Sequence, residues 1–212
     1  MLSKKEIAET IILQKYGGRP SSDNGIDVRD VYDVVDMIYA QLVSQEVAMQ
    51  IRGKSDFTVD SVWSRTFTNS IVLYDKTLEK CYINLPATRV YIDGDKDIRL
   101  VSWIQSENMP FSMIDNAALK AQSLLECGVP KEGTYKFYVD GQRLYFDRMP
   151  KRLKGNKILV KMVAGIDGYK PDDKLPVPSA FAYQLLEMTA AFFQVQITTL
   201  SKNTNDSNVN IK

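Results

Sequence analysis

The sequence predicts an α+β protein in which helices from both ends of the chain pack together as a helical bundle, with a mainly antiparallel β domain inserted between them. Apolar residues recur at the 3.6-residue period of a helix over 28–52 and again over 178–200. Between these segments the period changes toward two, the period of a β-strand. The chain has 212 residues, of which 44% are hydrophobic and 25% charged, a composition that excludes disordered and fibrous classes.

The first helix is predicted over residues 3–16. Ser3 and Glu6 have the spacing of a capping box, in which each side chain accepts a hydrogen bond from a backbone N–H at the start of the helix. A pair of glycines, 17–18, then ends the helix.

The strongest helical pattern covers residues 28–52, where Asp27 can cap the first turn. The apolar residues of this helix lie in two stripes, and a helix that is apolar on two sides must bury both. We therefore expect one stripe to pack within the chain and the other to contact a neighbouring subunit. The candidate interface residues are Val31, Tyr32, Val35, Ile38, Tyr39, Leu42, Val43 and Val47.

Residues 54–171 are predicted to form the mostly β middle region. Its first half contains a strand over 70–74, a turn, and a second strand over 80–85. Segments 88–92 and 98–104 alternate in the same way and flank a polar stretch, so they are expected to pair as a hairpin.

The second half of this region contains the clearest hairpin. It spans 134–146 and turns at Asp140-Gly141, a dipeptide that favours type I′ turns. A further strand is expected over 157–163, and one helix near 112–126, before the hairpin.

The last helix is predicted over 178–200, with Pro178 in its first turn, where a missing N–H is tolerated. Residues 1–53 and 172–200 are thus assigned to the helical bundle. Residues 201–212 are polar and have no core-forming pattern, so we expect a flexible tail that docks on a partner. The candidate docking residues are Asn203, Thr204, Asn205, Asp206, Asn208 and Ile211.

Residues for common catalytic and metal-binding chemistry are scarce. The chain has no His, the commonest general base and metal ligand, and its two Cys cannot build a Cys-rich zinc site. Asp93, Asp95 and Asp97 have the spacing of a calcium loop, but Ile98 and Ile104 stand where that loop needs Gly and Glu. No glycine-rich phosphate loop occurs. We therefore expect no enzymatic activity, no metal and no cofactor.

The net charge of +1 predicts no general attraction to nucleic acid or to anionic lipid, and no apolar run is long enough for a transmembrane helix. One local exception is a basic cluster that contains no acidic residue. It can contact phosphates or an acidic protein surface, or it can be a solvated loop and strand edge. Its candidate contact residues are Arg148, Lys151, Arg152, Lys154 and Lys157.

The end of the chain resembles the head-to-tail connector proteins of tailed bacteriophages, most of all the adaptor or neck ring proteins of crAss-like phages. The residues that carry the resemblance are Asp172-Asp173-Lys174-Leu175-Pro176-Val177-Pro178, the helical stretch from Phe181 to Met188, and the polar tail after Leu200. In this family a Leu-Pro-x-Pro segment precedes a helix, and a polar tail reaches a neighbouring ring. The acidic start of the long helix and the β middle domain look like the same class.

The resemblance implies a structural virion protein, made in the host cytoplasm, that forms a twelve-fold homo-oligomeric ring below the portal at the head-to-tail neck. Its partners would be the portal protein and other neck or tail proteins. DNA would pass through the ring without sequence-specific contacts, and no membrane contact is implied. Two other interpretations stay open: another tail or capsid auxiliary protein, and a soluble enzyme or nucleic-acid-binding module.

Overall fold

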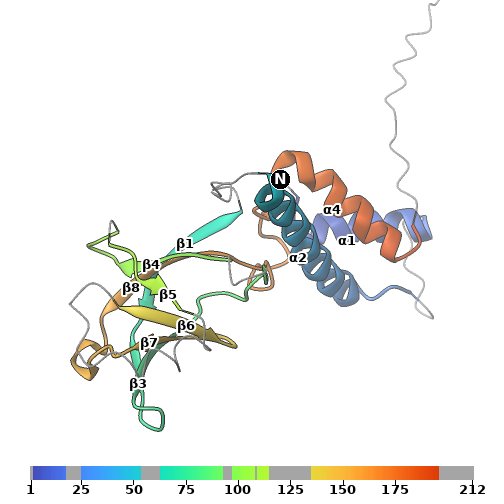
Figure 1. The fold of residues 1–212 in the computed structure, drawn as a ribbon. Helices are drawn as coiled ribbons and strands as arrows, with labels where there is room; N and C mark the ends of the chain where they lie inside the picture. Colours follow the sequence, from blue (N-terminus) through green and yellow to red (C-terminus); the bar gives the residue numbers. More distant parts are fainter. Residues whose placement is uncertain are drawn as a thin grey trace, which may run out of the picture.

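The computed structural model describes residues 2–17, 25–53, 63–92, 97–107, 109–114 and 135–195. This part of the chain is a mixed α+β fold with three helices and two β-sheets. The helices lie together on one side of the molecule and the strands on the other (Figure 1). Within the described part, no helix has the length and apolar character needed to cross a membrane.

The first helix, α1 (Lys4–Tyr16), begins as the sequence predicts. The Ser3 hydroxyl accepts a hydrogen bond from the Glu6 N–H at 3.2 Å, and the Ser3 N–H donates one to the Glu6 carboxylate at 2.8 Å. Gly17 ends the helix in the left-handed conformation, with a φ of 59° that glycine adopts without a steric penalty. Both predicted ends of this helix are confirmed.

The long helix α2 (Val28–Gly53) packs against α1 and against the last helix, α4 (Ser179–Phe192). The three helices share one apolar core. Trp63 joins this core from the start of the β region, because its ring centre lies 6.2 Å from that of Tyr39 and 5.2 Å from that of Phe181.

The last helix is shorter than predicted. It stops at Phe192, and Phe193 and Gln194 form a turn. Gln194 has a φ of 56°, which leaves the right-handed helical path. Pro178 precedes the helix as its N-cap, and residues 196–200 lie outside the described part.

The first sheet has the strand order β1-β8-β4, with both pairs antiparallel. Its strands are β1 (Ser64–Ile71), β4 (Ile98–Trp103) and β8 (Lys157–Val163). The predicted hairpin between 88–92 and 98–104 is wrong, because β4 pairs with β8 and residues 88–92 form no strand. An ion pair joins these segments instead: Arg89 donates to both carboxylate oxygens of Asp97, at 2.6 and 2.7 Å.

The second sheet has the order β2-β3-β7-β6-β5, and only its β5–β6 pair is parallel. Its strands are β2 (Leu73–Asp75), β3 (Lys80–Asn84), β5 (Ser112–Met113), β6 (Lys136–Asp140) and β7 (Arg143–Asp147). Because residues 112 and 113 belong to a strand, the helix predicted near 112–126 does not start there. Residues 115–126 lie outside the described part.

The predicted hairpin over 134–146 is confirmed as the β6–β7 pair, but its turn differs from the predicted type. Asp140 pairs with Arg143, so Gly141 and Gln142 form a two-residue loop. Gly141 has a φ of 57° and Gln142 has no positive φ. This combination is typical of a type II′ turn, whereas type I′ needs a positive φ at both positions.

A second apolar core takes side chains from both sheets. Phe111 lies near its centre, with its ring 5.4 Å from Trp103, 5.7 Å from Tyr135 and 5.8 Å from Phe146, all edge to face. Such pairs stabilise a core beyond the area they bury. The core therefore holds the two sheets against each other and sets the position of β1 relative to β3.

Candidate functional site

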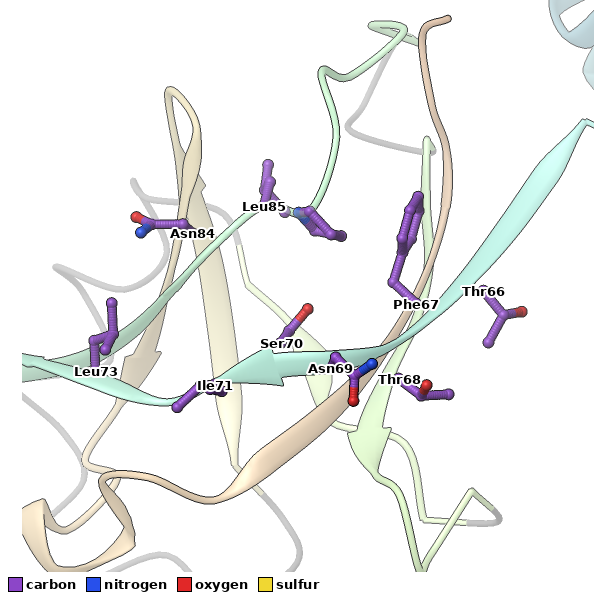
Figure 2. A pocket seen from close by; sticks show the side chains of 10 residues that line it. Thr66, Phe67, Thr68, Asn69, Ser70, Ile71, Leu73, Asn84 and Leu85 are labelled. Carbon is purple, nitrogen blue, oxygen red and sulfur yellow. The ribbon is translucent and has the colours of Figure 1, made fainter. Parts of the chain in front are cut away.

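A groove of 620 Å³ runs along β1; we call it the β1 groove (Figure 2). Six consecutive residues of β1, Thr66–Ile71, line one side, and Asn84–Pro86, at the end of β3 and just after it, line the other. Leu73 completes the lining. Successive residues of a strand point to opposite faces, so a hollow lined by six in a row follows the edge of the strand rather than one face.

The edge of β1 that borders this groove has no strand partner among the described residues. β1 is the outer strand of its sheet, and β8 is its strand neighbour on the inner side. An open strand edge presents N–H and C=O groups that can pair with another extended chain. The β1 groove thus has a backbone surface suited to a peptide segment.

A β-bulge shapes the floor of the groove. Phe67 pairs with Val160 and Ser70 with Ile158, so β1 has one residue more than β8 over this stretch. Phe67 and Ser70 both point toward Leu85 across the groove (Figure 2). The bulge therefore brings an aromatic ring and a hydroxyl to the same side of the strand.

The Ser70 hydroxyl is a buried polar group without a hydrogen-bond partner in the described part of the chain. Ser70 is only 7% exposed. Leaving a buried hydroxyl unpaired costs roughly 1–3 kcal/mol, and a group that bonds it recovers that free energy. The floor of the groove therefore has one unused polar contact beside its apolar side chains.

A second hollow of 510 Å³ continues the groove and shares Phe67 and residues 84–86 with it. This hollow adds three charged residues to the lining: Arg65, Arg143 and Asp167. The Asp167 carboxylate accepts a hydrogen bond from the Thr88 hydroxyl at 2.6 Å, which fixes its orientation. The extended groove therefore ends in a polar, charged region.

Arg65 is held from two sides at this end. Its guanidinium carbon lies 5.1 Å from the Tyr169 ring centre and 5.8 Å from that of Phe67, within the range of cation–π attraction. It also donates a hydrogen bond to the carbonyl of Gly165. Arg65 thereby ties β1 to the loop that follows β8 at the charged end of the groove.

Arg143 is the more accessible cation, with 48% of its side chain exposed. It lies 4.9 Å from the Tyr82 ring centre and donates a hydrogen bond to the Tyr145 hydroxyl at 3.3 Å. This hydrogen bond raises the pKa of Arg143 above its ordinary value. Arg143 therefore presents a positive charge to the solvent at any physiological pH.

The acidic and thiol side chains of the described residues have structural partners or surroundings. No cluster of His, Cys, Asp and Glu within the described ranges could hold a metal ion. Asp97 of the calcium-like spacing is fully buried against Arg89, and Asp93 and Asp95 lie outside the described residues. Burial raises the pKa of the Cys81 thiol, so this residue stays in its unreactive protonated form.

The predicted subunit interface on α2 is not a surface of the chain. Except for Tyr32, which is partly buried, all its members are buried in the shared helical core: Val31, Val35, Ile38, Tyr39, Leu42, Val43 and Val47. The expectation that one stripe stays free for a neighbour is wrong for this reason: α1 and α4 pack against α2, and residues such as Trp63 and Ile166 from the β region complete the cover. Of these residues, only the partly buried Tyr32 keeps an exposed surface that another subunit could contact.

The basic cluster lies in the connection from β7 to β8, which includes the short 3₁₀ helix η2 (Lys151–Leu153), and at the first residue of β8. Its members Lys151, Arg152, Lys154 and Lys157 are exposed, whereas Arg148 is partly buried. Arg148 pairs with Asp147 at 3.7 Å, and the Lys157 ammonium lies 3.4 Å from the side-chain oxygen of Asn69. Lys157 thus contacts β1 from the β8 side, and it lines a separate hollow beside Trp103 rather than the β1 groove.

Sequence reasoning did not find the β1 groove. Its polar lining residues Thr66, Thr68 and Asn69 are a weak signal of an exposed strand. The open edge itself depends on the pairing of β1 with β8, about ninety residues later in the chain, and no local pattern encodes such a pairing.

The predicted docking tail, residues 201–212, lies outside the described part of the chain. Comparison with known proteins adds no assignment, since the sequence matches no family model and no curated protein. The candidate site is therefore defined by its geometry alone.

Proposed function

We propose that this chain is a structural virion protein of a tailed bacteriophage that forms a ring at the head-to-tail connection below the portal. The ring docks the tail and helps to form the channel for DNA. One observation supports this proposal most: the β1 groove lies beside a strand edge that has no strand partner among the described residues. A protein whose site is an open strand edge beside an apolar groove functions by association.

In this proposal α1, α2 and α4 form a helical bundle that carries the inserted β domain. A ring needs two different faces on each subunit, because a head-to-tail contact joins unlike surfaces. The β1 groove supplies one face. Exposed apolar side chains on the helices are candidates for the other: Leu13, Met37, Tyr183 and Phe192.

The basic cluster has a place in the same proposal. A ring that surrounds DNA needs phosphate contacts without base recognition, and lysine and arginine side chains provide them. Arg152 and Lys154 are exposed and lie close together in the chain. They are the proposed contacts with the passing DNA or with an acidic surface of the portal.

Another tail or capsid auxiliary protein is the alternative, because the same groove would serve any assembly. An enzyme or a nucleic-acid-binding module has less support, since the described site lacks a nucleophile paired with a base and its aromatic side chains lie mainly in the core.

Disruption of the gene in the phage that encodes it tests the proposal. We expect DNA-filled heads that carry a portal but no tail, and rescue by the gene supplied in trans. Normal tailed particles without the protein, or heads that fail to form, would contradict a role at the head-to-tail connection.

A further inference from the structure

We propose that the β1 groove binds residues 208–212 of a neighbouring copy of this chain as an added β-strand. The inference rests on the proposed function in one respect, namely that copies of the chain stand side by side. It deepens that function by naming the segment that joins them.

The geometry of the groove favours a strand as its occupant. The lining by consecutive residues of β1 leaves the backbone edge of that strand open to a ligand, and β8 occupies the opposite edge. An added strand gains affinity from main-chain hydrogen bonds and specificity from pockets that take alternate side chains. The apolar side chains that line the groove are Phe67, Ile71, Leu73, Leu85 and Pro86.

The sequence of residues 208–212 fits this site. It reads Asn-Val-Asn-Ile-Lys, so Val209 and Ile211 point to the same side of an extended backbone and the asparagines to the other. Valine and isoleucine are β-branched and favour the strand conformation. Their side chains suit the pocket, and an asparagine amide or a backbone group can bond the unpaired Ser70 hydroxyl.

The length of the intervening chain allows the segment to reach another copy. The described structure stops at Val195, close to the end of α4 in the helical region, whereas the groove lies in the β region. Residues 196–207 span up to about 40 Å when extended. A contact from the tail of one copy to the groove of the next is of the head-to-tail kind that closes a ring.

The first test measures binding of a labelled peptide with the sequence of residues 201–212 by fluorescence anisotropy. The protein is the full chain with Val209→Asp and Ile211→Asp, so that its own tail does not compete. We expect saturable binding that Ile71→Asp weakens at least tenfold, since Ile71 lines the groove and is 48% exposed. The matched control is Leu78→Asp, an exposed apolar residue outside the groove, which should leave binding unchanged.

A second groove variant makes a smaller change, so that the test does not depend on whether Ile71→Asp folds. Ser70→Ala removes only the hydroxyl, and we expect it to weaken the peptide several-fold. Ser102→Ala removes another buried, unpaired hydroxyl on the far strand β4, and it should not affect binding. No saturable binding, or binding that none of the groove variants changes, would overturn the proposal.

The second test decides whether the segment comes from a neighbour. The tail variant (Val209→Asp, Ile211→Asp) and the groove variant (Ile71→Asp) should each stay monomeric in sedimentation experiments. The unmodified chain should form complexes under the same conditions, because each copy supplies both an intact tail and an intact groove. If the unmodified chain stays monomeric although the peptide binds, the tail folds back on its own chain and the proposed exchange is wrong. The proposed function and the proposed tail contact can fail separately. If either binding test fails, the gene disruption still decides where the protein acts in the virion. If the gene disruption contradicts a role at the neck, the results on peptide binding still stand.

Discussion

Asp97 is fully buried, and its carboxylate accepts two hydrogen bonds from Arg89. This geometry matches the planar fork of a guanidinium, which a lysine cannot reproduce. The pair holds the segment before residues 93–96 against the start of β4.

Removing one partner of this pair should lower the free energy of unfolding. Asp97→Asn removes the buried carboxylate that accepts two hydrogen bonds from Arg89, and we expect a loss of about 3–5 kcal/mol in the free energy of unfolding. Urea unfolding measures it. Lys5→Gln, which breaks the exposed pair between Lys5 and Asp172, is the control and should leave the midpoint unchanged. Equal effects of the two changes would show that burial of Asp97 is unimportant.

The two unpaired hydroxyls predict a gain in stability. Ser70→Ala and Ser102→Ala each remove a buried polar group that has no partner among the described residues, so each should raise the free energy of unfolding by about 1 kcal/mol. Thermal unfolding of the isolated chain provides the measurement. A loss of stability in Ser70→Ala would mean that this hydroxyl is already bonded in the free protein.

At the scale of elements, the start of α1 is tied to the segment before α4. Lys174 pairs with Glu6 at 2.8 Å, and the Leu175 N–H donates to the Leu2 carbonyl at 2.9 Å. The hydrogen bond from Lys174, and then that from the Ser3 backbone, lower the pKa of Glu6 below its ordinary value of 4.5. Glu6 therefore joins the helix cap and the contact between the two ends of the fold.

A lowered pKa of a carboxyl group means that its ionised form stabilises the folded state. That contribution is present above the unfolded pKa and is lost as the pH falls through the lower, folded pKa. Glu6→Gln should therefore lower the thermal midpoint at pH 7, and the difference from the unmodified chain should shrink as the pH falls below 4.5. A difference that does not depend on pH would exclude the charge of Glu6 as its cause.

Two substitutions on α2 should affect stability differently, because Val43 is buried in the helical core and Met37 is exposed. Val43→Asp places a charge in the core, where burial without a partner is prohibitive, so cooperative unfolding should disappear. Met37 is 49% exposed, and Met37→Asp should leave the fold intact while weakening self-association if this side of the helix contacts a neighbour. Circular dichroism and sedimentation measure the two effects. A folded Val43→Asp chain would contradict the structure of the helical core.

At the scale of the whole molecule, the sequence predicts correctly those features that depend on interactions between residues close together in the chain. The capping box of α1, the extent of α2 and the β6–β7 hairpin depend on residues close together in the chain. The pairing of β4 with β8 and the open edge of β1 depend on distant segments, so periodicity alone could not find them. The apolar pattern of α2 predicts correctly that most of its apolar residues are buried, but it does not say whether the cover comes from the same chain.

Electron cryo-microscopy of virions that contain this protein tests whether it forms a ring at the head-to-tail neck. We expect a twelve-fold ring of density directly below the portal, into which copies of the described fold fit. Density in the β1 groove of each copy should continue from the tail of its neighbour. A reconstruction in which this fold occupies the capsid shell or the tail tube, with other proteins filling the neck, would exclude the proposed ring.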